Sequence, residues 1–321
     1  FGERGAFIID GQKKICPIPK KLLRMGEESK MGKCNKRLLK THRINMKHKL
    51  FPLVTVVVAA YNSGRTIEKC LKSIKNQSYP NIDIVVVDSL YYDTKQQKKC
   101  RDIIKKYARY FQDGPERSIQ RNRGIEEAKG EYFLVIDQDM YLTKRVVEEC
   151  YKTLINKNFI AITIPEISIG KGFWTKCVSL ERYVSTFLEI GLNECCRFFR
   201  KKSAFRVGCY DPTIVGMEDS DFHYKMKAKG QIGKIKNYIY HDEGETKFFS
   251  RVMKKYYYSK AFKLFLKRYP NIAVNQLFPV KWAYIKHWDV FVKNPRLTFG
   301  IILLRGGEVL AGLLGLILNK K

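Results

Sequence analysis

Four short apolar runs divide the first half of the chain. They lie at residues 53–60, 82–87, 132–136 and 159–164. Each is rich in aliphatic or aromatic residues and long enough for one strand buried on both faces, as in parallel sheets. The runs therefore predict four buried strands.

The stretches between these runs have the spacing of helices. Ile67, Cys70, Leu71 and Ile74 recur at intervals of three and four residues, so one face of this helix is expected to be buried. Further helices are expected at residues 94–109, 116–129 and 143–156. Strands that alternate with helices predict an α/β fold, a parallel sheet with helices on both faces.

The second half of the chain has longer helical stretches. Helices are expected at residues 172–192, 218–229 and 247–268, and strands at residues 197–201 and 233–240. The tail is apolar but is interrupted by Arg305-Gly306-Gly307-Glu308. Its two apolar halves, residues 297–304 and 309–318, are each too short to span a bilayer.

A net charge of +30, from 61 Lys and Arg against 31 Asp and Glu, points to a polyanionic partner. Residues 1–50 hold 14 basic and 4 acidic residues, residues 222–321 hold 20 and 5, and residues 51–221 hold 27 and 22. A nucleic-acid-binding fold usually carries its basic face within the folded domain. The distribution makes nucleic acid a weaker candidate than an anionic membrane surface or a phosphorylated substrate.

The nine cysteines are scattered and form no CxxC pair. This pattern fits neither a disulfide framework nor a zinc site, and it indicates reduced thiols in the cytoplasm. The chain begins with Phe1 rather than methionine, and residues 1–50 show no sustained periodicity. We therefore expect residues 1–50 to be a basic extension that is disordered or not native to the protein.

Two carboxylates follow the third apolar run, in Asp137-Gln138-Asp139. Carboxylates at alternate positions of an extended segment point the same way, so the two can share one divalent cation with a diphosphate. An isolated motif of this kind is usually a solvated acidic loop. Its place at a predicted strand end, where α/β sheets bind ligands, favours the metal. Asp88 ends the second run in the same way.

Three further features carry candidate chemistry. In Glu218-Asp219-Ser220-Asp221, a carboxylate could take the proton of an attacking hydroxyl, although acidic residues also suit a helix start. His241 follows a predicted strand and is either a third metal ligand or a structural histidine. Arg117 and Arg121 share one helix face and either bind phosphate or ribose oxygens or form a solvated face.

Five segments between residues 52 and 244 resemble, in order and in spacing, the family 2 glycosyltransferases of the GT-A fold. The matching residues are Thr55-Val56-Val57-Val58-Ala59-Ala60-Tyr61-Asn62, Ile84-Val85-Val86-Val87-Asp88, Gln120-Arg121-Asn122-Arg123-Gly124, Gly130-Glu131-Tyr132-Phe133-Leu134-Val135-Ile136-Asp137-Gln138-Asp139 and Gly216-Met217-Glu218-Asp219. The set is far more specific than any single motif. It implies a Rossmann-like, mostly parallel sheet flanked by helices, to which this chain adds a basic, partly apolar helical C-terminal extension.

The resemblance also implies which residues bind a nucleotide-sugar donor. Ala60 and Tyr61 would contact the base and the ribose, and Asp88 would bind the nucleoside. Arg117 or Arg121 would reach the nucleotide or its phosphates.

The same resemblance implies the metal and the chemistry. Asp137 and Asp139 would hold Mn²⁺ or Mg²⁺ with the donor diphosphate, and His241 is the candidate for a third ligand. Asp219, with Glu218 beside it, would be the catalytic base of a single in-line displacement that inverts the anomeric carbon.

Two departures from the patterns of related enzymes bear on the substrate. Asp88 is followed by Ser89-Leu90-Tyr91 rather than by a second aspartate and Gly-Ser, so UDP, GDP and other nucleotide sugars all stay open as donors. Gln276 and Lys281-Trp282 do not match the Gln-x-x-Arg-Trp motif of processive synthases. We expect a non-processive enzyme that adds one sugar.

The C-terminal region is expected to meet a membrane. Residues 247–268 mix aromatic and basic side chains, which suits a membrane interface. With the apolar tail, they predict peripheral or monotopic attachment to anionic lipids at the inner, cytoplasmic face of the cell membrane, unless both apolar faces pack on the domain. The acceptor would then be a lipid-linked phosphate or a glycan.

The predicted organisation is an extension at residues 1–50, a GT-A domain at 51–245 and a membrane-associated helical region at 246–321. Two other functions stay open: a basic nucleic-acid-binding protein, and a catalytically inactive glycosyltransferase-like scaffold. The first explains the charge but not the acidic motifs. The intact acidic motifs also argue against the second.

Overall fold

The computed structural model describes residues 51–90, 94–188, 195–271 and 282–318. Residues 50–321 form one compact unit, to which every described helix and strand belongs. Residues 1–50 lie outside the described residues. The expectation of a disordered or non-native extension concerns those residues and stays a prediction.

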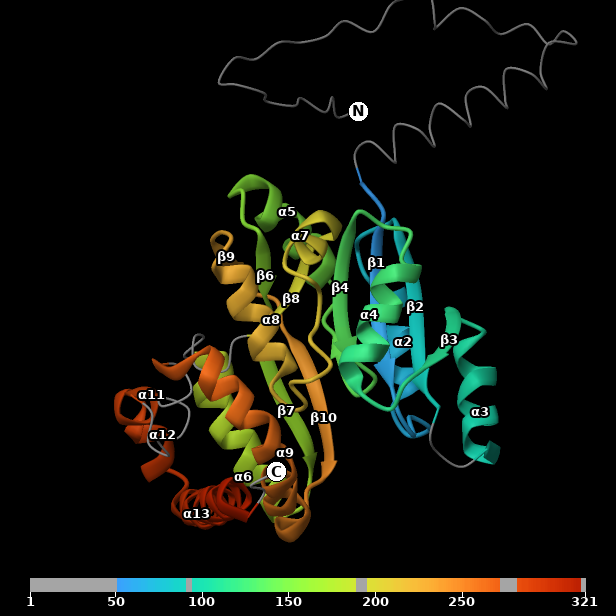
Figure 1. Ribbon diagram of the computed structural model, residues 1–321. Coiled ribbons are helices and arrows are strands. Elements are labelled where there is room, and N and C mark those ends of the chain that lie inside the picture. Colours follow the sequence, from blue (N-terminus) through green and yellow to red (C-terminus); the bar gives the residue numbers. More distant parts are fainter. Residues whose placement is uncertain (1–50, 91–93, 189–194, 272–281, 319–321) are drawn as a thin grey trace, which may run out of the picture. The chain divides into compact units, whose positions relative to one another are not determined.

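A seven-stranded sheet forms the centre of the compact unit (Figure 1). Its strands are β1 (Val54–Ala60), β2 (Ile82–Ser89), β3 (Arg109–Asp113), β4 (Tyr132–Asp137), β6 (Ala161–Thr163), β8 (Cys196–Arg200) and β9 (Ile232–Lys234). They lie in the order β3-β2-β1-β4-β8-β6-β9. Only β8 runs antiparallel to its neighbours in this sheet, so the predicted mostly parallel α/β sheet is confirmed.

Helices cover both faces of the sheet (Figure 1). They are α2 (Ile67–Lys75), α3 (Thr94–Ile104), α4 (Arg117–Glu127), α5 (Val146–Asn156), α7 (Lys201–Arg206) and α8 (Glu218–Lys227). Side chains alternate along β1 because successive residues of a strand point to opposite faces. Val56 and Val58 join the core under α2, α3 and α5, whereas Val57 joins the core under α4, α7 and α8.

A smaller sheet of three strands adjoins the carboxyl end of β4. It consists of β5 (Met140–Leu142), β10 (Ile239–Glu245) and β7 (Glu166–Lys171), in the order β5-β10-β7. Because β5 follows β4 after a two-residue turn, the small sheet begins where the third apolar run ends.

The remaining helices gather beside the small sheet (Figure 1). They are α6 (Phe173–Arg182), the π-helix η2 (Tyr183–Leu188), α9 (Phe248–Arg268), α11 (Trp282–Lys286), α12 (Trp288–Val292) and α13 (Pro295–Leu318). Helix α13 packs mainly on α9 and α6.

The structure corrects the predicted strands. The sequence analysis missed β3, β5 and β7, which are short or only partly apolar. The strand expected at residues 233–240 is two strands, β9 and β10, in different sheets. The chain turns between them because the backbone N–H groups of Lys236 and Asn237 both donate to the Glu149 carboxylate, at 2.9 Å each. His241 consequently lies within β10 and does not follow a strand.

The expectation of an interrupted tail is also wrong. Helix α13 runs for 24 residues without a break and is long and apolar enough to cross a membrane. Its polar residues do not break it because they are satisfied by the domain. Arg305 donates two hydrogen bonds to Glu181 of α6, at 2.7 and 2.5 Å, and also bonds Glu308. Glu308 accepts a hydrogen bond from a second partner, Arg251 of α9, at 2.8 Å.

Small residues let α13 lie close to α9. A side-chain Cβ at Gly315 would lie 2.2 Å from the Ser259 hydroxyl oxygen, and one at Gly307 would lie 3.0 Å from a Val252 methyl carbon. In the sequence, the Gly306-Gly307 pair suggested an interruption of the tail. In the structure, Gly307 instead permits close packing of two helices.

We predict that Glu181→Gln destabilises the fold by about 3 kcal/mol, because it leaves the Arg305 guanidinium short of its buried counter-charge. Urea unfolding followed by circular dichroism measures the change. Asp289→Asn is the matched control: its exposed pair with Lys293 should contribute less than about 1 kcal/mol. Equal stability of the two variants would show that the Arg305 cluster does not hold α13 in place.

Candidate functional site

The carboxyl ends of β1, β2 and β4 meet at one edge of the large sheet. Ala60 is paired with Asp88 of β2, and Ala59 with Asp137 of β4. This register follows from parallel pairing of three buried strands, and it brings predicted residues from three separate segments together.

Gln138 ties the loop after β1 to the turn after β4. Its side-chain amide donates to the Tyr61 carbonyl at 2.6 Å and accepts from the Tyr61 backbone N–H. The Gln138 backbone N–H also donates to the Ala59 carbonyl, at 3.2 Å. The Tyr61 side chain itself is 54% exposed, so it is presented to solvent beside the carboxylates.

Arg121 lies at the centre of the acidic residues and is completely buried. Its guanidinium donates to Asp219 at 2.6 Å and to Asp137 at 2.8 Å, and one of its nitrogens lies 3.6 Å from Glu218. The helix that carries it, α4, can approach β1 because residue 124 is glycine: a Cβ there would lie 2.2 Å from a Val57 methyl carbon. One buried cation thus joins a strand end to the first turn of α8.

Arg117, one turn earlier on α4, faces the same acids. It lies 3.1 Å from Glu218 and 3.6 Å from Asp137. Burial alone would raise the pKa of Asp137, but Arg121, Arg117 and Arg197 outweigh this and hold it well below its usual value. Burial raises the pKa of Glu218, against the opposing effect of Arg117.

Asp219 and Glu218 differ in their access to solvent. The Asp219 side chain is 28% exposed and lines a cavity, whereas that of Glu218 is 4% exposed and does not line it. Of the two candidate bases, Asp219 is therefore the one that a bound substrate can reach.

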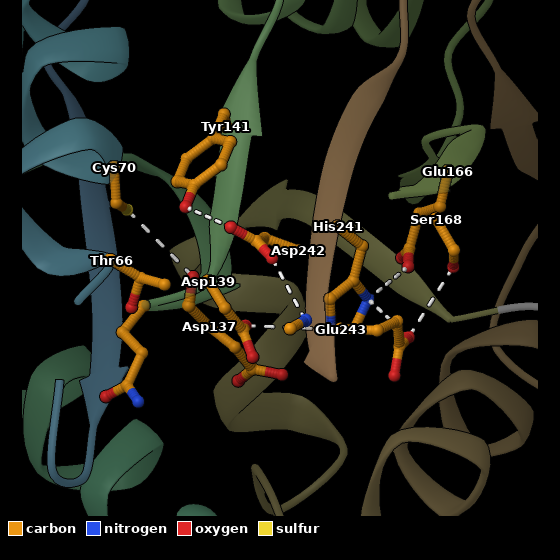
Figure 2. Close-up of polar contacts among 12 residues, drawn as sticks. Thr66, Cys70, Asp137, Asp139, Tyr141, Glu166, Ser168, His241, Asp242 and Glu243 are labelled. Carbon is orange, nitrogen blue, oxygen red and sulfur yellow. Dashed lines mark hydrogen bonds and ion pairs between the residues drawn. The ribbon is translucent and has the colours of Figure 1, made fainter. Parts of the chain in front are cut away.

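His241 lies between carboxylates on both sides (Figure 2). Its Nε2 atom is 3.6 Å from Asp139, and its Nδ1 atom is 3.2 Å from Glu166. Arg182 also approaches Nδ1, at 3.2 Å. Burial lowers the pKa of His241, but the carboxylates of Asp139 and Glu166 on either side outweigh it and raise the pKa to about 10. The imidazole is therefore expected to be a cation at neutral pH when no metal is bound.

The turn that carries Asp139 is fixed by its own backbone. The Asp139 carbonyl accepts the N–H of Asp242 at 2.8 Å, which holds the turn against β10. One carboxylate oxygen of Asp139, the one 3.6 Å from His241 Nε2, is buried and accepts no hydrogen bond within normal distance. A buried carboxylate oxygen without a donor is costly unless a cation reaches it.

Within the described residues, no three His, Cys, Asp or Glu side chains are grouped closely enough to hold a metal by themselves. Mg²⁺ and Mn²⁺ often need only one or two protein carboxylates and take their other ligands from substrate phosphates and water. The unpartnered oxygen of Asp139 fits that role. His241 could join it only as the neutral imidazole, after losing its proton.

Asp88 lies deeper than the other candidates. It is fully buried, and it accepts hydrogen bonds from the Ser89 N–H at 3.1 Å and the Tyr110 hydroxyl at 3.3 Å. It does not line the cavity. The structure thus brings Ala60, Tyr61, Asp88, Asp137 and Asp139 to one edge without testing their predicted roles.

A cavity of about 460 Å³ extends from the acidic residues around Arg121 to α6, α9 and α13. Asp137, Asp219 and His241 line its inner end. The sequence analysis did not single out Glu166, Arg182 and Arg197, which also line it. Glu166 and Arg197 form a nearly buried pair, with 2.6 Å between Nε and the carboxylate. Glu166 was missed because β7 was not predicted, and Arg197 was missed because its partner lies 31 residues away in the sequence.

Comparison with known proteins agrees with this fold. The profile of glycosyl transferase family 2 matches residues 55–208. Glycosyltransferase GlyG of Streptococcus pneumoniae is 31% identical over 110 residues, which are 33% of this chain and 36% of GlyG. The chain spans 36% or less of three curated relatives that match at 31–32% identity.

Two solved structures share the fold. The mannosyltransferase PcManGT of Pyrobaculum calidifontis, in complex with GDP-Man and Mn²⁺, has a TM-score of 0.56 at 17% identity and covers 90% of this chain and 96% of its own. Residues 1–349 of S. aureus TarS, in complex with UDP-GlcNAc, have a TM-score of 0.54 at 16% identity and cover 84% and 91%. The expected GT-A fold is confirmed.

We predict that His241 titrates near pH 10 in the metal-free protein and that Glu166→Gln lowers this pKa. Because the folded pKa lies above the ordinary 6.5, the stability that His241 contributes is complete below pH 6.5 and is lost as the pH rises toward 10. NMR of the imidazole in the presence of a chelator gives the pKa, and unfolding at several pH values gives the stability. An ordinary pKa in both proteins would contradict the described contacts.

Proposed function

We propose that this chain, whose residues 55–208 form a family 2 glycosyl transferase domain, moves one sugar from a nucleotide-sugar donor to a lipid-linked or glycan acceptor with inversion. One observation carries the proposal. Buried Arg121 joins Asp137, at the carboxyl end of β4, to Asp219, at the start of α8. Candidate donor-binding and acceptor-activating carboxylates thereby lie a few ångströms apart around one cation.

The donor nucleoside would lie over the ends of β1 and β2. Ala60, exposed Tyr61 and Asp88 are the residues at that edge. Two structural neighbours with this fold are in complex with UDP-GlcNAc and GDP-Man, respectively, so the fold accommodates different bases. The nucleotide and the sugar of this chain's donor therefore stay open.

Asp139 and Asp137 would hold a divalent cation with the donor diphosphate, and His241 would join them after losing its proton. Mn²⁺ or Mg²⁺, when bound, would stabilise the negative charge of the leaving nucleoside diphosphate. PcManGT is in complex with Mn²⁺, which supports metal use by this fold in general. The buried Asp139 oxygen that accepts no hydrogen bond supports it in this chain.

Asp219 would act as the base. Its carboxylate faces the cavity and would accept the proton of the acceptor hydroxyl as that oxygen attacks the anomeric carbon. The bond from the anomeric carbon to the diphosphate oxygen would break on the opposite side, which inverts the carbon. Arg121 would hold Asp219 in position, and Arg117 would neutralise Glu218 beside it.

We predict that Asp219→Asn binds the donor as the wild type does but lowers the transfer rate by about 10²- to 10⁴-fold, the usual contribution of a general base. Asp139→Asn should lose the Mn²⁺-dependent part of donor binding. A thermal-shift screen of nucleotide sugars with and without Mn²⁺ measures binding, and release of nucleoside diphosphate measures transfer.

Asp102→Asn, at an exposed position of α3, is the control and should behave as the wild type. Full activity of both site variants would disprove the assignment of the residues. A wild-type protein that responds to no nucleotide sugar would disprove the enzymatic function itself.

We further propose that residues 246–321 hold the catalytic domain, residues 51–245, on the cytoplasmic face of a membrane. Helix α13 has exposed apolar side chains along its outer face, namely Phe299, Ile302, Leu303, Leu310, Leu314, Ile317 and Leu318. Its middle is held on the domain by the bonds of Arg305 and Glu308. A helix fixed this way along its length favours lying in the plane of the interface over crossing the bilayer.

We predict that Leu314→Glu lowers binding to vesicles of phosphatidylglycerol and phosphatidylcholine about tenfold or more. The change removes an apolar side chain that is 53% exposed and adds a charge that anionic lipids repel. Co-sedimentation with the vesicles measures binding. Ile155→Glu on α5, at a 38% exposed apolar position, is the control and should bind as the wild type does; equal loss in both variants would contradict the assigned surface.

A further inference from the structure

The outer end of the cavity has walls of two kinds. One face of α9 lines it with Arg251, Lys255, Ser259 and Phe262, which follow one another at intervals of three or four residues. The facing side of α13 adds an apolar wall of Val309, Leu313 and Leu316. A cationic wall therefore meets an apolar wall at the end of the cavity that adjoins the exposed face of α13.

Nearly all the basic side chains that line the cavity are already neutralised by carboxylates. Five arginines are paired: Arg117 with Glu218, Arg182 with Glu243, Arg197 with Glu166, Arg251 with Glu308, and Arg305 with Glu181. These pairs cancel most of the positive charge of the side chains that line the cavity.

Lys255 is different. Among the residues that the structure describes, no carboxylate lies within 4.0 Å of its ammonium group. Glu308 and Glu181 act on it from farther away, but they are paired with Arg251 and Arg305. The side chain is open to the cavity but enclosed by protein, and this desolvation lowers its pKa. A cation without a counter-ion in such a place is stabilised by any anion that enters the cavity.

We propose that this end of the cavity binds the phosphate of an acceptor that carries a hydrocarbon chain. Lys255 would meet the phosphate, and Leu313 and Leu316 would cover the first carbons of the chain. The inference rests on the proposed glycosyltransferase function and makes its acceptor more specific.

The surroundings favour a phosphate ester of a lipid over a free anion or a neutral glycan. A free phosphate would leave the apolar wall of α13 in contact with water, and a neutral glycan would leave Lys255 without a counter-ion. The chain of a lipid could continue past Leu313, which is itself 45% exposed, to the outer face of α13. That face is the proposed membrane surface.

Citronellyl phosphate, a short and water-soluble isoprenyl phosphate, is a suitable probe for the full chain without vesicles. Isothermal titration should show that it binds more tightly than inorganic phosphate and more tightly than citronellol, its uncharged alcohol. Lys255→Ala should weaken its binding about tenfold, whereas Lys254→Ala, an exposed neighbour that does not line the cavity, should not.

The apolar wall is tested by a second pair of variants. Leu316→Asn should weaken citronellyl phosphate binding, and Ile155→Asn on α5, an exposed apolar position outside the cavity, should leave it unchanged. Inorganic phosphate bound as tightly as the ester would indicate an anion site only, and citronellol bound as tightly would indicate an apolar site only. Either result, or equal binding by Lys255→Ala and wild type, would overturn the proposal.

The donor gives an independent readout, because Lys255 lies outside the residues assigned to donor and metal. Lys255→Ala should keep the nucleotide-sugar thermal shift of the wild type. A wild type that binds a nucleotide sugar but not citronellyl phosphate would overturn the acceptor inference alone. A wild type that binds no nucleotide sugar would instead remove the proposed function on which the inference rests.

Discussion

Arg121 and its carboxylates impose the main constraint on this fold. A fully buried guanidinium is costly in a low-dielectric interior unless several acceptors surround it, and here Asp137 and Asp219 bond it directly while Glu218 lies close by. These acids come from positions 16 to 98 residues away in the sequence. Any arrangement that separates β4 from α8 would deprive buried Arg121 of at least one of these carboxylates. The electrostatics of this cation and the position of the proposed base are therefore linked.

A second buried cluster joins the C-terminal helices to the same site. Glu181 and Arg182 are adjacent on α6 but face different partners: Glu181 binds Arg305 of α13, and Arg182 approaches His241 of β10. One rigid helix thus contacts both the apolar helix and the histidine beside Asp139. The proposed membrane surface and the proposed metal site are therefore joined through one helix, and this contiguity explains why the cavity runs from one to the other.

The sequence predicted what depends on local pattern. The four apolar runs became β1, β2, β4 and β6, and their carboxyl ends brought Asp88 and Asp137 to one edge, as parallel pairing requires. What it could not predict depends on distant partners. Arg121 was expected to face phosphates, and its burial among acids follows only from where α8 lies. Likewise, Arg305 and Glu308 suggest a break in the tail until Glu181 and Arg251 supply their counter-charges.

These ion pairs change how the net positive charge of the chain should be interpreted. The C-terminal 100 residues are strongly basic, yet most of their charge inside the cavity is cancelled by buried carboxylates, so net charge alone says little about what binds there. The informative residue is the lining cation that no carboxylate neutralises by direct contact, Lys255. Since Lys255 stands without a carboxylate partner among the described residues and next to an apolar wall, the cavity is complementary to a small anion joined to an apolar group. The remaining basic residues, on exposed surfaces, are screened by salt and would act mainly by attracting the protein to an anionic interface.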